Sequence, residues 1–474
     1  MRVLSVASEV YPLIKTGGLA DVVGALPAAL AREGIEVVTL VPGYPSVMAA
    51  LTDASPIYWM DELFGGPATI LVADVDGLDL FVIEAKHLYD RPGGPYAGPD
   101  GDWGDNAFRF AALSRVAAQI AYGEIAGFVP DVIHAHDWQA GLVPAFLRYD
   151  ARRHAPSVMT VHNLAFQGQF RPDILPLLGL PPHAFALDGV EYYGMIGYLK
   201  AGLAMATRVT TVSPTYAEEI RAEEGGMGLA GLLRGRGSDL RGILNGIDTT
   251  VWDPATDGAL AERFTVETLG NRAANKAALQ QELGLEVNPA RLLFGVVSRL
   301  SWQKGLDLLP AVIEKLEAIG AQLALIGTGD HEIEEAIARA ASARPHDVAA
   351  VFGYNEGLAH RMQAGADALI VPSRFEPCGL TQLCALRYGA LPVVSRVGGL
   401  ADTVADVDIM GSAATGVQFF PVTADELGNA LQRTADLWQT PDEWRRVQVS
   451  AMAQDVSWAK PARHYADLYR EIAG

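Results

Sequence analysis

The sequence of 474 residues is poor in cysteine and has no long hydrophobic run. Its two cysteines, Cys378 and Cys384, are too close together in the chain to cross-link distant segments. A disulfide-rich secreted protein is therefore excluded, and a reducing compartment, the cytoplasm, is expected. No apolar run reaches the roughly 18 residues that a membrane-spanning helix needs, and a hydrophobic strand follows Met1 at once. We therefore expect neither a signal segment nor a membrane partner.

Positive charge is also scarce, because 36 Lys and Arg face 56 Asp and Glu, a formal net charge of −20. A field of this sign repels nucleic acid and anionic lipid, and no local basic patch offsets it, so neither is an expected partner. Half of the residues are hydrophobic and 19% are charged, which is typical of a globular protein with large cores. The length favours two or three folding units.

Short apolar runs alternate with helical patterns along the whole chain, which predicts an α/β fold of parallel sheets covered by helices on both faces. Buried strands are expected at residues 37–42, 131–134, 157–161, 208–212, 240–244, 292–297, 322–326, 348–352, 368–371 and 391–394. Helices are expected at residues 21–33, 106–122, 306–319, 331–342, 356–365, 380–388 and 458–472. In residues 68–85, two apolar runs that meet at Asp76-Gly77 predict an appended hairpin.

A polar interval at Asp248–Pro289 without strand patterns divides these elements into two doubly wound domains. We expect domains at residues 1–247 and 248–457, followed by a helix within 458–474. Ligands of such folds bind beyond the carboxyl ends of the strands, where the strand order reverses. Polar and glycine-rich segments at strand ends are therefore the candidate sites.

Three loops combine glycines or cations with a helix start. Lys15-Thr16-Gly17-Gly18 precedes a helix, and such a segment can bind an anion, or it is only a turn. Arg299 and Lys304 follow the strand at 292–297, where two cations in an acidic protein predict a phosphate or diphosphate site, or they are solvated loop cations.

The third loop places the Glu376 carboxylate beside the start of a helix whose free amides belong to Gly379, Leu380 and Thr381. A carboxylate that holds hydroxyls next to amides that hold phosphates fits a sugar nucleotide. The alternative for Glu376 is a helix cap. Cys378 is expected to be a small buried filler rather than a nucleophile.

Two polar clusters close first-domain strands: His134-Ala135-His136-Asp137 and His162-Asn163. Alternation places His134 and His136 on one face of a strand, but no further ligand pattern accompanies them, so contact with substrate is favoured over a metal site. A buried, hydrogen-bonded role is the alternative for His134. Tyr96, in a loop rich in glycine and proline, is expected either to stack on a sugar ring or to anchor the loop.

Nine segments together resemble the bacterial glycogen synthases that use ADP-glucose, which plastid starch synthases also resemble. They are KTGGLADVVGALP (15–27), HAHDW (134–138), TVHNLAFQG (160–168), VSPTYAEEI (212–220), LNGID (244–248), SRLSWQKG (298–305), GTGD (327–330), PSRFEPCGLTQL (372–383) and VGGLADTV (397–404). They occur in the family's order over nearly the whole chain.

The resemblance implies the GT-B architecture, in which two Rossmann-like domains face each other across a deep cleft. It also implies a retaining transfer of glucose from ADP-glucose to the non-reducing 4-hydroxyl of an α-1,4-glucan such as glycogen, with release of ADP. It implies no cofactor or metal, and it implies that the C-terminal helix within residues 458–474 crosses back to the first domain. The predicted catalytic residues are Glu376, Arg299, Lys304, Asp137 and His162. The predicted substrate-binding residues are Lys15, Gly18, Asp21, Tyr96, Asn163, Asn245, Tyr354, Cys378, Gly379, Leu380 and Thr381, with Tyr354 against the adenine.

Two positions depart from the family pattern: Gln139, where histidine is common, and Cys384, where many relatives of this fold carry a second glutamate. Three alternative functions stay open. A glucan phosphorylase would need a pyridoxal phosphate lysine segment, which the sequence does not resemble. A catalytically silent glucan-binding protein would tolerate the loss of Glu376, Lys15 or Arg299, but all three are present. A related transferase using UDP-glucose and another acceptor is the third.

Overall fold

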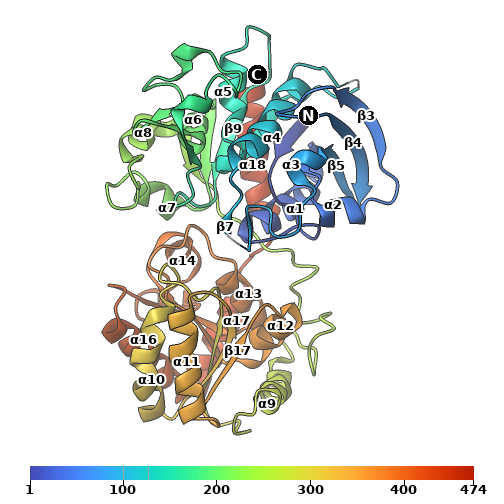
Figure 1. Cartoon of the computed structure of the whole chain (residues 1–474). Helices are drawn as coiled ribbons and strands as arrows, with labels where there is room; N and C mark the ends of the chain where they lie inside the picture. Colours follow the sequence, from blue (N-terminus) through green and yellow to red (C-terminus); the bar gives the residue numbers. More distant parts are fainter. Residues whose placement is uncertain (100, 126) are drawn as a thin grey trace. The chain divides into compact units, whose positions relative to one another are not determined.

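A computed structural model describes residues 1–99, 101–125 and 127–474. These residues form two compact units, one of residues Met1–Asn245 with Trp458–Gly474 and the other of residues Gly246–Ser457. The first unit ends at Asn245, two residues before the expected boundary. Figure 1 shows each unit as a sheet with helices on its faces.

The first unit is built on a nine-stranded sheet of order β14-β13-β9-β8-β1-β2-β5-β4-β3. Its strands are β1 (Arg2–Val6), β2 (Glu36–Pro42), β3 (Ser55–Met60), β4 (Ala68–Val75), β5 (Leu78–Glu84), β8 (Val132–His136), β9 (Ser157–Val161), β13 (Arg208–Thr211) and β14 (Leu240–Gly242). The strands from β14 to β5 are parallel. The strand order reverses at β1 and β8, so the loops after these two strands occupy the switch point.

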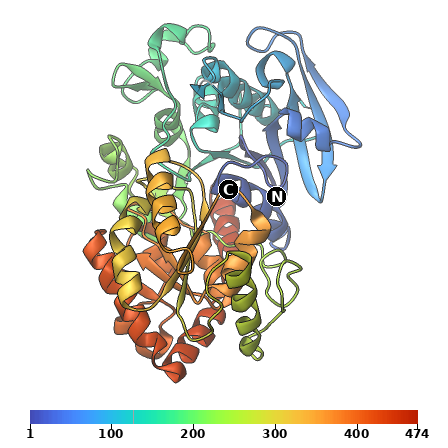
Figure 2. The same ribbon diagram turned by 60° about the horizontal axis from the view of Figure 1, so that its bottom comes forward.

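The predicted hairpin is confirmed, because β4 and β5 are antiparallel and turn at Asp76 and Gly77, which have φ of 54° and 81°. The hairpin is not wholly appended, however, since β5 also pairs in parallel with β2. Strand β3 was not predicted. It lies at the edge of the sheet (Figure 2) and is half exposed, so its sequence Ser-Pro-Ile-Tyr-Trp-Met has no continuous buried run.

The helices of the first unit cover both faces of its sheet. They are α1 (Gly18–Ala31), α2 (Pro45–Ala50), α3 (Lys86–Tyr89), α4 (Asn106–Ala121), α5 (Val143–Arg148), α6 (Tyr198–Met205), α7 (Pro214–Glu219), α8 (Ala230–Gly235) and α18 (Ala459–Ala473). Short strands β6 (Ala97–Gly98), β7 (Gly101–Asp102), β10 (Gln169–Phe170), β11 (Glu191–Tyr192) and β12 (Met195–Gly197) form two small sheets. Consecutive residues of β1 point to opposite faces: Leu4 belongs to the core that contains α4, and Val3 packs with α1 and α18.

The second unit contains a parallel sheet of order β17-β16-β15-β18-β19-β20, whose switch point lies between β15 and β18. Its strands are β15 (Leu293–Val297), β16 (Gln322–Gly327), β17 (Val348–Phe352), β18 (Ala368–Val371), β19 (Leu391–Ser395) and β20 (Val417–Phe419). The five predicted strands of this unit are confirmed. The sequence did not predict β20, because three residues are too few to form an apolar pattern.

Helices α10, α11 and α16 pack on one face of this sheet, and α9 and α12 pack on the other (Figure 1). The helices are α9 (Arg272–Glu282), α10 (Leu309–Ala318), α11 (His331–Ala343), α12 (Glu356–Gly365), α13 (Thr381–Tyr388), α14 (Gly398–Thr403), α15 (Val407–Met410), α16 (Ala424–Trp438) and α17 (Pro441–Met452). Helix α10 begins three residues later than predicted, after a 3₁₀ turn at Leu306–Leu308, and Pro310 occupies its first turn. None of the helices in the described ranges is both long and apolar enough to cross a membrane.

Helix α18, red in Figure 1, follows the second unit in sequence but belongs to the first. Its apolar side, with Ala462, Tyr465, Leu468 and Tyr469, is buried in a cluster that also contains Val22 and Leu26 of α1. This packing explains the spacing of apolar residues along α18.

We predict that Leu468→Ala destabilises the protein by about 2–5 kcal/mol, because Leu468 is 1% exposed and its truncation leaves a cavity. Asp467→Ala is the matched control on the solvent side of the same helix, where a substitution changes the free energy of unfolding by about 0.5 kcal/mol or less. Denaturant titrations of the two variants measure the difference. Equal stability of both would contradict the docking of α18.

Candidate active site

The two loops at the switch point of the second unit are joined directly. The loop after β15 carries Arg299 and Lys304, and the loop after the neighbouring β18 carries Glu376. The Arg374 amide donates to the Gln303 carbonyl oxygen at 2.9 Å. The Arg374 guanidinium donates to the Trp302 carbonyl oxygen at 2.7 Å and to both carboxylate oxygens of Asp307 at 2.6 and 2.8 Å. The structure therefore brings the second and third predicted loops together.

Lys304 and Glu376 form an ion pair within this arrangement, with Nζ 2.5 Å from Oε2. The Ser373 hydroxyl donates to the same oxygen at 2.9 Å. Glu376 is 5% exposed and is therefore buried. The helix-cap interpretation is wrong, because α13 has no side-chain cap hydrogen bond. The carboxylate is thus held in one position by a cation and a hydroxyl.

Arg299 differs from Lys304 because it is exposed and its guanidinium has no hydrogen bond or ion pair with any described residue. Arg299 lies at the carboxyl end of a parallel strand. Because its guanidinium makes no contact of this kind within the described chain, it is available to a ligand. Its five N–H donors suit a phosphate or diphosphate.

Helix α13 begins beside Glu376. Gly379, at φ 73°, turns the chain into the helix, and the first amides of a helix have no intrahelical acceptor. The Thr381 hydroxyl donates to the Val297 carbonyl oxygen at 3.3 Å, which ties this start to the end of β15. Gln382 Nε2 donates to the carbonyl oxygens of Cys378 and Gly379 at 3.1 and 2.9 Å. The predicted amides of Gly379, Leu380 and Thr381 therefore lie at the same sheet edge as the two cations.

The two cysteines play structural parts. Neither Cys378 nor Cys384 forms a disulfide, and both are buried, as expected of Cys378 as a small filler. Cys384 packs in an apolar cluster with Ile247, Leu383 and Leu386, so the position where many relatives carry a second glutamate contributes no carboxylate.

Tyr354 follows β17 at the carboxyl edge of the same sheet. Its ring is 75% exposed, and its hydroxyl donates to Glu356 Oε2 at 3.0 Å. An exposed, anchored ring can stack on a planar ligand such as a nucleobase.

In the first unit, the loop after β1 is held by a carboxylate that sequence reasoning missed. Glu9 is 2% exposed and accepts hydrogen bonds from the Thr16 amide, the Thr16 hydroxyl and the Tyr96 hydroxyl. Its position just after a buried strand was the available signal. Gly18 starts α1, and Lys15 Nζ lies 2.7 Å from Asp21 Oδ1. The predicted ligands Lys15 and Asp21 thus form a partly exposed ion pair.

Tyr96 anchors its loop. Its hydroxyl also bonds to Ser8 Oγ at 2.7 Å, and its ring contacts Phe110 and Trp138. Of the two roles considered for Tyr96, the geometry shows the anchoring one.

The two polar clusters of the first unit meet at the ends of β8 and β9. His134 and His136 lie on one face as predicted, with ring centroids 4.0 Å apart. His136 Nδ1 is 2.9 Å from His162 Nε2. His134 is 1% exposed and bonds to Thr160 Oγ1 at 2.5 Å, so the buried, hydrogen-bonded interpretation of His134 is correct. No group of three His, Cys, Asp or Glu residues in the described part of the chain could hold a metal ion.

Asp137 adopts φ 55° and ψ −173°, a conformation that costs a residue with a side chain about 1–3 kcal/mol. Its Oδ1 accepts a hydrogen bond from the His162 amide at 2.7 Å. Burial raises the pKa of the Asp137 carboxyl to about 7, although hydrogen bonds from the amides of His162 and Asn163 oppose the rise. A strained, hydrogen-bonded carboxyl with a shifted pKa is characteristic of a functional position.

Three amide side chains lie in this region. Asn163 Oδ1 accepts from the Ala165 amide at 3.0 Å in a local turn. Asn245 is 8% exposed, and its buried Oδ1 has no hydrogen-bond partner among the described residues. Gln139, which stands where the family commonly has histidine, is 5% exposed, and its Oε1 also has no hydrogen-bond partner within the described chain. Buried polar atoms without partners are rare, so Asn245 is a candidate for ligand contact.

The buried histidines make stability depend on pH. Burial lowers the pKa of His134 and of His162 to about 3 and that of His136 well below its usual value. All three are neutral in the folded chain at pH values where the unfolded chain protonates them, so stability falls as the pH drops below about 6.5. Asp137 acts in the opposite direction, because between pH 4 and 7 it keeps a proton that the unfolded chain releases.

We predict that this cluster lowers the free energy of unfolding by roughly 2 kcal/mol per pH unit between pH 6 and 5, the net effect of three histidines and one carboxyl. Asp137→Asn removes the opposing contribution and raises the loss by roughly 1 kcal/mol per pH unit. Denaturant titrations at pH 7, 6 and 5 measure both slopes. Parallel curves for the two proteins would show that Asp137 is ionised throughout.

The chain matches known protein families over most of its length. The family model described as the starch synthase catalytic domain matches residues 2–235, and the model for glycosyl transferases group 1 matches residues 279–447. The chain is 60% identical to a glycogen synthase of Methylocella silvestris and 59% identical to one of Acidiphilium cryptum, in each case over 100% of this chain and 99% of the relative.

Two solved structures are similar over 99% of this chain. One is the catalytic domain of starch synthase IV from Arabidopsis thaliana bound to ADP and acarbose, which is 33% identical with a TM-score of 0.91 over 99% of its length. The other is sucrose-phosphate synthase from Thermosynechococcus elongatus, which is 20% identical with a TM-score of 0.59 over 98% of its length and supports the fold alone. The predicted GT-B fold of two Rossmann-like domains is confirmed, and the chain belongs to the glycogen and starch synthase family of glycosyltransferases.

Proposed function

We propose that this enzyme transfers glucose from ADP-glucose to the non-reducing 4-hydroxyl of an α-1,4-glucan such as glycogen, with release of ADP and retention of the anomeric configuration. Three findings support the proposal: the relatives named glycogen synthase, the solved relative bound to ADP and acarbose, and the site at the second switch point. Cys378 and Cys384 form no disulfide, which suits activity in the cytoplasm.

The observation that carries the proposal is the ion pair between the buried Glu376 carboxylate and Lys304, on the two loops that also carry Arg299 and the start of α13. When the bond between glucose C1 and the diphosphate oxygen breaks, negative charge builds up on the departing ADP. Arg299, Lys304 and the amides of Gly379 to Thr381 stabilise that charge as it forms, and fixed donors of this kind typically contribute about 100-fold to 1,000-fold in rate each. The proposed reaction uses only the two substrates and no cofactor.

Glu376 holds hydroxyls of the transferred glucose, because its carboxylate accepts hydrogen bonds while Lys304 balances its charge. Retaining hydrolases use a second carboxylate about 5 Å from the first. Position 384 of this chain is a buried cysteine. We therefore assign the same-face route, in which the acceptor oxygen bonds to C1 on the side that ADP leaves, and the acceptor proton passes to the departing diphosphate.

For the first unit we propose contacts with the sugars. Asp137, His162, Asn163 and Asn245 bind glucose or acceptor hydroxyls, and the unpartnered Asn245 oxygen supports this role. Lys15 and the Gly18 amide bind the sugar nucleotide, with Asp21 holding Lys15 in place. Tyr354 of the second unit stacks on the adenine.

The test is to offer ADP-glucose and UDP-glucose separately with glycogen and to measure nucleotide release and glucose incorporation. Faster release of ADP with incorporation into glycogen is expected. Preference for UDP-glucose would establish the related transferase instead. Glycogen binding without ADP release would establish a silent binding protein, and an aldimine absorbance band in the purified protein would indicate a phosphorylase.

A further inference from the structure

A chain of hydrogen bonds runs from Ser5 on the first strand through both ring nitrogens of His136 to His162. Ser5 Oγ on β1 is 3.3 Å from His136 Nε2, and His136 Nδ1 is 2.9 Å from His162 Nε2. Both nitrogens of His136 are therefore used inside the protein. His162 keeps one nitrogen, Nδ1, without a hydrogen bond to any described residue.

A neutral imidazole has one N–H donor and one acceptor nitrogen, so a single proton lies between His136 and His162. The chain can be ordered in two directions, and the two orders give His162 Nδ1 opposite roles, donor or acceptor. Which order holds depends on the atom at the far end, the Ser5 hydroxyl.

Ser5 decides the order because it is 5% exposed and its hydroxyl has no other hydrogen-bond partner among the described residues. A buried hydroxyl hydrogen needs an acceptor, and His136 Nε2 is the one within reach. If Ser5 donates to Nε2, the proton of His136 must be on Nδ1, where it donates to His162 Nε2. His162 then carries its own proton on Nδ1.

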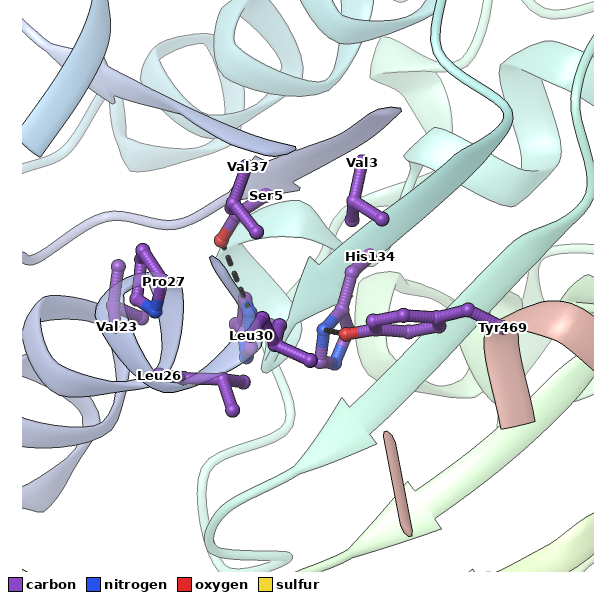
Figure 3. Close-up of a pocket in the computed structure, with 10 residues that line it drawn as sticks. Val3, Ser5, Val23, Leu26, Pro27, Leu30, Val37, His134 and Tyr469 are labelled. Carbon is purple, nitrogen blue, oxygen red and sulfur yellow. Dashed lines mark hydrogen bonds between the residues drawn. The ribbon is translucent and has the colours of Figure 1, made fainter. Parts of the chain in front are cut away.

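The ring of His136 packs against the ring of His134. His134 lies against it and is held at both nitrogens, by the Tyr469 hydroxyl at 2.7 Å from Nδ1 and by Thr160 Oγ1 at 2.5 Å from Nε2. Figure 3 shows the Ser5 bond and the Tyr469–His134 bond at the edge of a small cavity. Apolar side chains of α1, including Val23, Leu26 and Leu30, line the rest of that cavity. Low polarity around the chain strengthens its hydrogen bonds.

We propose that Ser5 and His136 are positioning residues that fix the tautomer and orientation of His162, so that His162 presents an Nδ1–H donor to a sugar oxygen. His134, which is held by Tyr469 of α18, packs against His136 and keeps its ring in place. The proposal rests on the proposed function only for the identity of the sugar ligand, because the proton order is a property of the protein alone.

The test is ¹⁵N NMR of the histidine-labelled full-length protein at pH 7.5, with the His162 signals assigned by their loss in His162→Gln. We expect a protonated Nδ1 and an unprotonated Nε2 on His162. A proton on Nε2 of His162 in the unmodified protein would overturn the proposal.

Ser5→Ala and Ser5→Thr form a matched pair, because only threonine keeps the hydroxyl. We expect Ser5→Ala to give mixed His162 tautomers and to lower kcat about 10-fold with little change in the KM for the sugar nucleotide, a loss typical of supporting hydrogen bonds. Ser5→Thr restores the single tautomer and most of kcat. An unchanged tautomer and kcat in Ser5→Ala would refute the positioning role.

The two proposals fail separately. If the protein shows the expected His162 tautomer but transfers no glucose, the proposed function is wrong and the proton order stands. If it transfers glucose at full rate while His162 is protonated on Nε2, the function stands and the positioning role is wrong. Tyr469→Phe adds a third measurement, with an expected shift of the His134 Nδ1 signal.

Discussion

Glu376→Gln lowers kcat by about 100-fold to 1,000-fold in the ADP-release assay with ADP-glucose and glycogen. The substitution keeps the shape of the side chain but removes the charge that Lys304 Nζ contacts at 2.5 Å. The amide accepts hydrogen bonds from sugar hydroxyls more weakly than a carboxylate, and Lys304 loses the partner that orients it toward the diphosphate. The effect is therefore on the transition state and appears mainly in kcat.

Glutamine is preferred to alanine at this position because Glu376 is buried. Alanine would also leave a cavity, so a loss of activity could reflect unfolding. Glu335→Gln is the matched control, since Glu335 is an exposed carboxylate on α11 that also pairs with a cation, Arg339. If Glu376→Gln and Glu335→Gln retained equal kcat, Glu376 would have no part in the reaction.

Arg299→Ala lowers kcat by about 100-fold to 1,000-fold while the melting temperature changes by less than about 2 °C. The guanidinium has no described partner in the protein, so its removal breaks no internal contact. Its proposed partner is the diphosphate of the leaving ADP, on which negative charge grows in the transition state. The loss should be larger in kcat than in glycogen binding.

Arg339→Ala, on the exposed side of α11, is the control that removes an arginine of the same unit away from the switch point. Calorimetry and ADP-release kinetics on both variants separate stability from catalysis. Near-normal turnover of Arg299→Ala would show that Arg299 is only a solvated loop cation, which is the alternative that its exposure leaves open.

The parallel strands of the two large sheets could be predicted from sequence because a strand buried on both faces is apolar at consecutive residues. Ser157–Val161, Val348–Phe352 and Ala368–Val371 match the structure residue for residue. Strands β3 and β20 could not be predicted for the converse reason. The first is an edge strand exposed to solvent, and the second is three residues long, so neither carries a continuous apolar run.

The candidate site divides in the same way. Lys304 and Glu376 could each be singled out from a local motif, but they are 72 residues apart in sequence, and their ion pair exists because β15 and β18 are neighbours in the sheet. The hydrogen bond from the Tyr96 hydroxyl to Glu9 is also nonlocal, since 87 residues separate the two in sequence.

The sequence by itself determined the α/β class, most of the strands, the family and the chemical types of the candidate residues, because these depend on local periodicity and on motifs of neighbouring residues. Only the tertiary structure decided that Glu376 is buried against Lys304, that Arg299 is left unpartnered among the described residues, and that Ser5, His136 and His162 share one chain of hydrogen bonds. Burial and hydrogen bonding arise between strands that are distant along the chain, and the order of strands in a sheet is set by packing.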